Sequence, residues 1–198
     1  NWSGGGSLSF SDGSGGTAGF GTQSAAVNCG GFTGGDETGR TEEYNGSSWS
    51  SSNTMSTPIY GSSGWGTESA GAVVGGTLYG PTQRDRTTTQ EYNGSTWSNS
   101  NNCSTGVSQA ATFGTQSAGV KATGASGGSS AVDTTTCETY NGTSWSSTGS
   151  MSTGRRYAAG FGSSSKGYVS GGENGGTDQQ STETFNGSTW SSDTNLPA

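Results

Sequence analysis

The chain has 198 residues, a formal net charge of −7 and no histidine. The lack of histidine excludes Ser-His and Cys-His catalysis and removes the side chain that most often acts as a general base or metal ligand. Only seven residues are basic, and no apolar run approaches the roughly 18 residues of a membrane-spanning helix, so we expect neither a nucleic-acid partner nor membrane insertion.

Glycine accounts for 39 residues, whereas leucine, isoleucine, valine and phenylalanine together account for 17. So few aliphatic residues are typical of disordered chains. The net charge is small for a disordered chain, however, and the 19 aromatic residues recur at fixed places. We therefore expect a folded protein whose core consists of aromatic side chains packed against glycine, alanine, serine and threonine.

The first residues resemble the end of a repeat. Trp2-Ser3 matches later Trp-Ser pairs, but no aromatic-Asn-Gly turn precedes it. Residues 1–7 are thus predicted to be the tail of a preceding unit. The four predicted units that follow are 8–55, 56–103, 104–151 and 152–198. An apolar or sulfur-containing residue lies six residues after Trp2 and six residues after the tryptophan that ends each later Asn-Gly turn. These residues are Leu8, Met55, Cys103, Met151 and Leu196.

A glycine-rich turn with an aromatic residue lies early in each unit. Its first copy is Gly19-Phe20-Gly21, and it returns around Trp65, Phe113 and Phe161. Glycine readily supplies the positive φ angles of tight turns, so a hairpin is predicted here. A short strand and a polar loop of variable length follow. Three of these strands end in a glycine pair: Gly30-Gly31, Gly75-Gly76 and Gly171-Gly172.

The strongest repeated signal is the segment from Tyr44 to Trp49, Tyr-Asn-Gly-Ser-Ser-Trp. It returns at 92–97, 140–145 and 185–190, with spacings of 48, 48 and 45 residues. Asn-Gly between two strand-like segments predicts a β-hairpin, and an even loop places Tyr44 and Trp49 on one face. Each unit then presents an aromatic pair that can pack on the next unit, with a polar residue beside it: Glu42, Gln90, Glu138 and Glu183.

A period of this length indicates stacked supersecondary units. Each unit has room for about four short strands, and no helical periodicity occurs. The predicted fold is therefore all-β: a β-propeller of four repeats of about 48 residues, each a four-stranded blade. A β-solenoid is the alternative.

These residues resemble the kelch repeat family, in which a strand ending in two glycines is followed by an acidic residue, a tyrosine and a tryptophan. In the first unit these are Gly30-Gly31, Glu42, Tyr44 and Trp49. Two departures occur, because the third unit lacks the glycine pair and Gln90 replaces the acid. The resemblance implies a kelch-like propeller. Since kelch propellers usually have more than four blades, it also leaves open that the chain is part of a larger propeller.

The glycine- and serine-rich Tyr-Asn-Gly-Ser-Thr-Trp turns are similar to kelch-like repeats in structural proteins of marine and cyanobacterial phages. This resemblance implies a non-enzymatic structural or assembly module of a virion appendage or extracellular fibre. It would lie on the virion surface or outside the cell, partnered by further copies or other structural subunits, and could contact a host surface. The alternative is a secreted adhesin or a lectin-like propeller that binds surface glycans.

Four aromatic residues in the glycine-rich turns are candidates for surface contacts, with packing between neighbouring units as the alternative: Phe20, Trp65, Phe113 and Phe161. No catalytic residue, metal site or cofactor is predicted. The acidic turns at 12–15 and 173–178 carry oxygen ligands but do not complete a calcium-binding spacing.

Cys103 and Cys137 both depart from the residues at equivalent places in other units, which suggests a disulfide between neighbouring units and leaves Cys29 free. The alternative for Cys103 is a small buried hydrophobic residue. Four asparagines in the Asn-Gly turns also form N-glycosylation sequons: Asn45, Asn93, Asn141 and Asn186. Turn geometry explains them without glycans, whereas a secretory route would make them acceptors.

Overall fold

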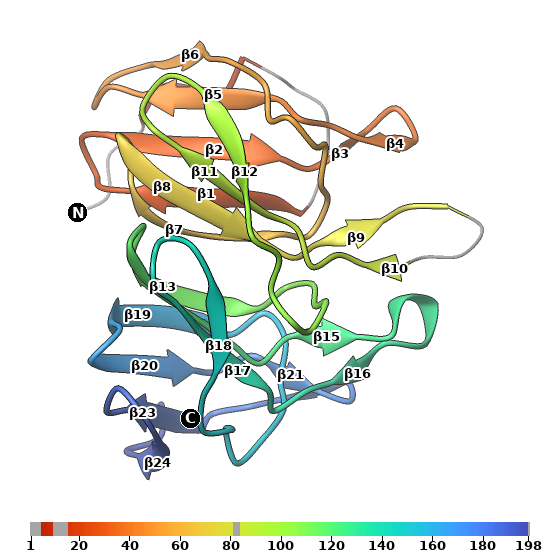
Figure 1. Ribbon diagram of the computed structural model, residues 1–198, viewed down its shortest axis with the longest axis vertical. Coiled ribbons are helices and arrows are strands. Elements are labelled where there is room, and N and C mark those ends of the chain that lie inside the picture. The colour runs from red at the N-terminus through yellow and green to blue at the C-terminus, as the bar shows by residue number, and fades with distance from the viewer. Residues whose placement is uncertain (1–4, 10–15, 81–83, 198) are drawn as a thin grey trace.

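A computed structural model describes residues 5–9, 16–80 and 84–197. The described chain is an all-β repeat fold built around four antiparallel sheets of four strands each (Figure 1). We call these sheets units 1 to 4, in chain order. Each unit is formed by one continuous stretch of sequence, which leaves and re-enters the sheet once.

In every unit the strands are hydrogen-bonded in chain order, from first to fourth. Unit 1 comprises β1 (Thr17–Gly21), β2 (Ala26–Gly30), β5 (Thr41–Tyr44) and β6 (Trp49–Ser51). Unit 2 comprises β7 (Ser63–Thr67), β8 (Ala70–Val74), β11 (Thr89–Tyr92) and β12 (Trp97–Ser100). Unit 3 comprises β13 (Ala111–Thr115), β14 (Ala118–Ala122), β17 (Cys137–Tyr140) and β18 (Trp145–Ser147). Unit 4 comprises β19 (Ala159–Ser163), β20 (Lys166–Ser170), β23 (Thr182–Phe185) and β24 (Trp190–Asp193).

Between its second and third strands, each unit sends out a small two-stranded hairpin. The hairpins lie on one side of the molecule, at the right of Figure 1, and we call this side the hairpin face. A short 3₁₀ helix, η1 (Gly128–Ser130), interrupts the third hairpin. The hairpin strands are β3 (Phe32–Thr33) with β4 (Asp36–Glu37), β9 (Thr77–Leu78) with β10 (Arg84–Asp85), β15 (Ala125–Ser126) with β16 (Val132–Asp133), and β21 (Glu173–Asn174) with β22 (Thr177–Asp178).

The predicted Asn-Gly hairpins join the third and fourth strands of each unit. Tyr44 lies directly opposite Trp49, and their rings are 5.1 Å apart. The loop holds four residues, and Gly46 takes the positive φ of 91°. The Oδ1 atom of Asn45 accepts hydrogen bonds from the amides of Ser47 and Ser48, both at 3.0 Å. Asparagine therefore closes this loop through its side chain rather than through a positive φ of its own.

The hydrophobic core lies between units rather than inside them. Phe20 of unit 1 packs edge-on against Trp97 of unit 2, with ring centroids 6.2 Å apart, and covers Gly71. A methyl group at Gly71 would lie 2.0 Å from the Phe20 ring. Trp65 meets unit 3 and Phe113 meets unit 4 in the same way, so the aromatic-on-glycine core expected from composition is formed three times.

The polar residue that recurs beside each aromatic pair binds the backbone of the segment that leads into that unit. Glu138 accepts hydrogen bonds from the amides of Ser104 and Thr105, at 2.8 and 3.1 Å. It also forms a buried ion pair with Lys121 at 2.6 Å. Gln90 and Glu183 hold the equivalent segments, and Glu183 pairs with the buried Arg155 at 2.9 Å. These polar groups are satisfied inside the fold, which gives them a structural role.

The four units form an open row. The first strands follow one another, with β1 beside β7, β7 beside β13 and β13 beside β19. Unit 1 and unit 4 lie at opposite ends of the molecule in Figure 1. In the described part of the chain, unit 4 therefore has a neighbour on one side only.

Candidate functional site

The structure corrects the prediction for three of the four surface aromatics. Phe20, Trp65 and Phe113 are only 9%, 3% and 3% exposed, because each is covered by the following unit. Packing between units, the alternative for these residues, is what the structure shows. Phe161 is 51% exposed, because nothing in the described residues packs over it as the following units pack over the other three.

The predicted disulfide between Cys103 and Cys137 is wrong. All three cysteines are free and buried. Cys103 packs among residues of units 2 and 3, around Trp65 and Tyr140, whereas Cys137 packs among residues of units 3 and 4, around Phe113 and Phe185. The two thiols therefore belong to different core clusters. Burial raises the pKa of Cys137 to about 11 and also raises that of Cys103.

The four sequon asparagines lie in exposed Asn-Gly loops. Their Oδ1 atoms accept hydrogen bonds from loop amides, as described for Asn45. In the last loop the Nδ2 atom of Asn186 also donates to Thr189 Oγ1 at 3.0 Å. The structure thus supports their role in the turns.

None of the helices in the described residues is long and apolar enough to cross a membrane.

A row of carboxylates on the hairpin face was not anticipated from the sequence. Asp85 accepts hydrogen bonds from the amides of Gly127 and Gly128 in the next hairpin, at 2.7 and 2.8 Å. Asp133 likewise accepts from Gly175 at 2.8 Å, and Glu37 accepts from Tyr79. Each carboxylate comes from the second residue of a hairpin's second strand. The recurrence of an acidic residue at this position is the sequence signal from which the row could have been predicted. The carboxylates join neighbouring hairpins.

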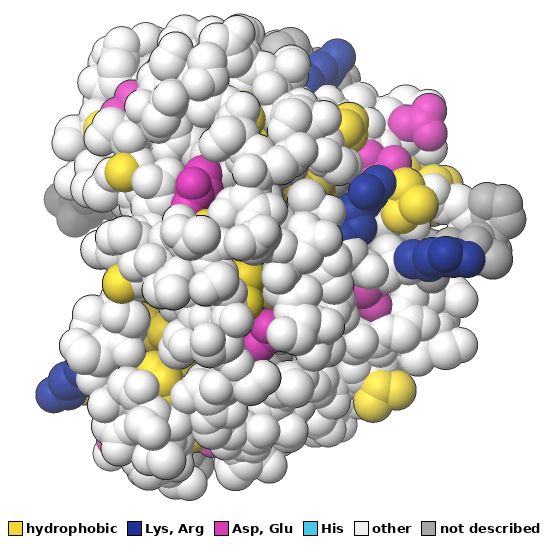
Figure 2. Space-filling view, in the orientation of Figure 1, with side chains coloured by type: hydrophobic (Ala, Val, Ile, Leu, Met, Phe, Trp, Pro, Cys, Tyr) yellow, Lys and Arg dark blue, Asp and Glu magenta, His cyan; other side chains and the backbone are white. Residues whose placement is uncertain are grey.

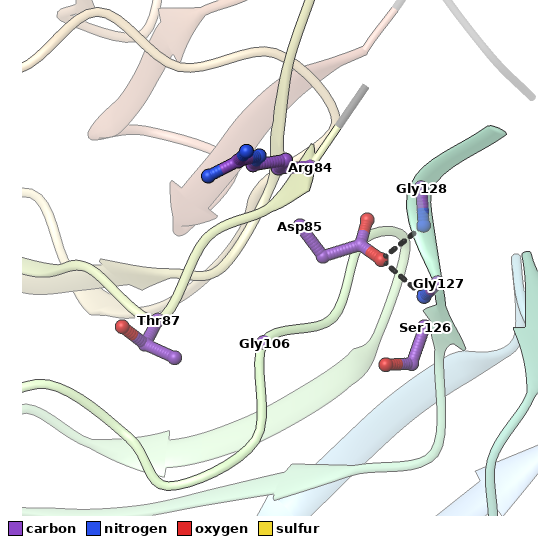
Figure 3. Close-up of a pocket in the computed structure, with 7 residues that line it drawn as sticks. All are labelled: Arg84, Asp85, Thr87, Gly106, Ser126, Gly127 and Gly128. Atoms are coloured by element: carbon purple, nitrogen blue, oxygen red, sulfur yellow. Dashed lines mark hydrogen bonds between the residues drawn. The ribbon is translucent and has the colours of Figure 1, made fainter. Parts of the chain in front are cut away.

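A cavity of about 350 Å³ on this face lies between the second and third hairpins. Figure 3 shows that the Asp85 carboxylate points across it to the Gly127 and Gly128 amides, while the Arg84 side chain points away from them. Thr87 and Ser126 add hydroxyl groups to its wall. The carboxylate is already engaged in joining hairpins, so this cavity is primarily a structural junction.

A second cavity of about 170 Å³ lies closer to the first strands. The residues that line it include Tyr60, Gln109, Arg156 and Tyr157. Gln109 and Tyr157 have φ angles of 54° and 57°, where the equivalent Gly61 has 68°. Strained backbone of this kind costs about 1–3 kcal/mol per residue and is concentrated at functional sites. The side chain of Tyr157 is 62% exposed, so it lies at the surface of the molecule beside this cavity.

Charged and aromatic side chains gather on the hairpin face. In Figure 2 most of the dark-blue groups and several magenta groups lie over the hairpins at the right, whereas the visible surface of the units is mostly white with scattered magenta and yellow groups. The Nε atom of Arg156 lies 3.1 Å from Asp133 Oδ1 and 3.6 Å from Glu173 Oε1, so this cation is already paired. Tyr157, which follows Arg156 in the sequence, is exposed, and so is Tyr79, whose amide donates to Glu37. The hairpin face is therefore one candidate binding surface.

The second candidate surface is the exposed side of unit 4, which we call the open end and define by Phe161, Tyr168, Thr182 and Leu196. The rings of Phe161 and Tyr168 stack at 5.3 Å with an interplanar angle of 16°. The Leu196 amide donates to the Gln180 carbonyl at 2.8 Å, just as that of Met55 donates to Gly39 at 2.7 Å. Leu196 is 46% exposed, however, whereas Met55 is 4% exposed. The open end thus displays what units 1 to 3 bury.

No protein-family model matches the chain, and no curated protein sequence matches it. Among solved structures, that of YjhT is similar, with a TM-score of 0.65 and 14% sequence identity over 80% of this chain and 53% of YjhT. The chain therefore spans about half the length of YjhT. At this identity the likeness shows a shared fold only.

Proposed function

We propose that the chain is a non-enzymatic structural and assembly module of a virion appendage or an extracellular fibre. Its four units would be blades of a kelch-like propeller arrangement, as one part of a larger propeller. The all-β repeat architecture and the packing of each unit on the next support this proposal. The location in a virion or fibre rests on the similarity of the repeats to phage structural proteins.

The observation that carries the assembly role is the open end. Phe161 and Leu196 are about half-exposed at positions whose equivalents are buried in units 1 to 3. Large apolar side chains gathered on one surface commonly mark a protein–protein interface. The recurrent carboxylates do not favour catalysis, because they bind backbone amides or buried cations.

Immunogold electron microscopy tests the proposal. An antibody against the folded chain would be applied to the organism that produces it and to particles and filaments shed from it. We expect gold on particles, appendages or extracellular fibres, and none after adsorption of the antibody with pure protein. Label spread through the cell interior, with bare particles and filaments, would contradict the proposed function.

A second candidate function is glycan binding on the hairpin face. The exposed Tyr157 beside Gln109 and Tyr60 favours it, because aromatic rings and a few polar groups around a small hollow are typical of ligand sites. On a glycan array we expect binding that Tyr157→Ala abolishes and that Tyr168→Ala, at the open end, leaves unchanged. An empty array, or equal loss with both variants, would count against this candidate.

A further inference from the structure

We propose that the open end binds one further four-stranded unit of the same kind, which must offer a glycine to Phe161 and an indole N–H to Thr182. We further infer that unit 1 of a second copy of this chain is not that partner. This inference rests on the proposed assembly function and names the chemistry of the partner. All three interfaces inside the chain supply the template for the glycine, and the first two supply the template for the indole N–H.

The first requirement is a glycine beneath the aromatic ring. A methyl group would lie 2.0 Å from the Phe20 ring at Gly71, 2.5 Å from Trp65 at Gly119 and 2.0 Å from Phe113 at Gly167. Real Cβ atoms do not come this close to a ring, so each interface depends on the missing side chain. Phe161 is the fourth aromatic in this series, and it lies in the same register of its sheet as Phe113.

The second requirement is a tryptophan that donates to the preceding unit. Trp97 Nε1 donates to Thr41 Oγ1 at 2.9 Å, and Trp145 Nε1 donates to Thr89 Oγ1 at 2.9 Å. Thr182 begins β23 as Thr41 begins β5. The Thr182 hydroxyl has Ser170 Oγ as a neighbour at 2.8 Å, and a hydroxyl can accept a further hydrogen bond. Thr182 is therefore ready to receive an indole N–H.

The third feature is the apolar residue after the last strand. Met55, Cys103 and Met151 occupy this position in units 1 to 3 and are 3–4% exposed. Leu196 keeps the same backbone contact to its own unit but remains 46% exposed. A following unit would cover Leu196 together with Phe161.

Unit 1 of a second copy lacks the required surface in two respects. Ala26 stands in the sheet register where units 2, 3 and 4 have glycine, so its methyl group would meet Phe161. Residues 5–9 also already lie on unit 1. The Ser9 amide donates to Glu42 at 2.9 Å, just as the Thr57 amide donates to Gln90 at 2.9 Å. The place for a connecting segment from another copy is therefore filled.

Tyr168 distinguishes the open end from the internal interfaces. Its equivalents are Val27, Ala72 and Val120, which are buried within the core. Its ring stacks on Phe161 and gives that residue a partner in the absence of a fifth unit. The alternative is that Phe161 stays stacked on Tyr168 and caps the end of the fold, in which case an added unit would not pack against Phe161.

The experiment extends the full chain by one unit. A copy of residues 152–198 is joined directly after Leu196, and the free energy of unfolding is measured for the four-unit and five-unit chains. We expect Phe161→Ala to change the unfolding equilibrium constant of the four-unit chain little and that of the five-unit chain by about 100-fold. The matched control is Gly167→Ala in the copied unit, which should remove most of the dependence on Phe161.

Equal effects of Phe161→Ala in both chains would overturn the proposal and identify the Tyr168 stack as a cap. Sedimentation of the unextended chain tests the exclusion of a second copy, and we expect a monomer at all concentrations. Oligomers that Phe161→Ala dissociates and Ala26→Gly strengthens would overturn that exclusion. These measurements do not depend on where the protein lies in the organism, so they can fail independently of the immunogold result.

Discussion

The indole of Trp190 differs from those of Trp97 and Trp145 in its hydrogen bonding. Each of the latter donates to a threonine hydroxyl of the preceding unit. Within the described residues, the buried Trp190 Nε1 has no hydrogen-bond partner. The reason is the residue at the equivalent place in unit 3, Cys137, whose thiol is a weak acceptor. The exception therefore follows from a single substitution in the repeat.

We predict that Cys137→Thr stabilises the protein by about 1 kcal/mol, because it supplies the missing acceptor for Trp190 Nε1 at little change in volume. Urea denaturation of both proteins measures the difference. The control is the same substitution in a Trp190→Phe background, where no N–H is available and no gain is expected. A gain of equal size in that background would show that the hydrogen bond is not its source.

Glu138 gives the protein a specific sensitivity to acid. Burial raises the pKa of its carboxyl, but the Lys121 ammonium and the amides of Ser104 and Thr105 outweigh this effect and hold the pKa below its ordinary value. A lowered pKa in the folded state stabilises the protein above the ordinary glutamate pKa of about 4.3, and this contribution is lost as the pH falls through the lowered pKa.

We predict that the free energy of unfolding falls more steeply with acidification in the unmodified protein than in Glu138→Gln. The reason is that the glutamine side chain of the variant does not take up a proton in this pH range. Urea denaturation at a series of pH values below about 5 measures the two slopes. Asp36→Asn, at an exposed hairpin position, is the control and should keep the steep slope. Identical slopes for Glu138→Gln and the unmodified protein would refute the assignment.

At the scale of elements, the hairpins depend on one another more than on their own strands. Each has only two residues in each strand, which is marginal for an isolated hairpin. The carboxylates Glu37, Asp85 and Asp133 each reach the next hairpin. The hairpin face is therefore ordered as a row, and its last member, with Asp178 in the equivalent position, ends that row.

We predict that Asp85→Ala speeds amide hydrogen exchange at Gly127 and Gly128 by about tenfold, because these amides lose their acceptor. Exchange measured by NMR resolves the two glycines. Asp178→Ala is the matched control, since Asp178 has no following hairpin to hold in the described chain. Unchanged exchange at both glycines in Asp85→Ala would show that the carboxylate does not hold the third hairpin.

At the scale of the whole molecule, stability resides in the contacts between units. Gly119 lies under Trp65, whose Nε1 donates to the Thr115 carbonyl at 2.9 Å. We predict that Gly119→Ala destabilises the protein by about 1–3 kcal/mol through overpacking, as measured by thermal or urea denaturation. Gly19→Ala is the control, because its methyl group would lie 3.7 Å from the nearest atom. Equal losses for the two variants would indicate a general cost of alanine in these strands.

Several features of the fold could be predicted because their causes are local and repeated. The Asn-Gly loops, the opposed pair of Tyr44 and Trp49 and the all-β repeat architecture follow from a short motif that occurs four times. A hairpin joins residues only a few positions apart, so a short stretch of sequence determines its register. Aromatic packing against glycine was likewise expected from composition.

The tertiary structure alone decided which residues are exposed and which groups meet. Trp97 and Thr41 are 56 residues apart, and the hairpin carboxylates lie about 42 residues from the amides that they bind. Contacts between residues so far apart in the sequence bury Phe20, place Cys103 and Cys137 in different core clusters and leave Trp190 Nε1 without an acceptor. The short motifs carry no information about them. The repeat motif determines the contacts within a unit, whereas burial and the open end depend on how one unit packs on the next.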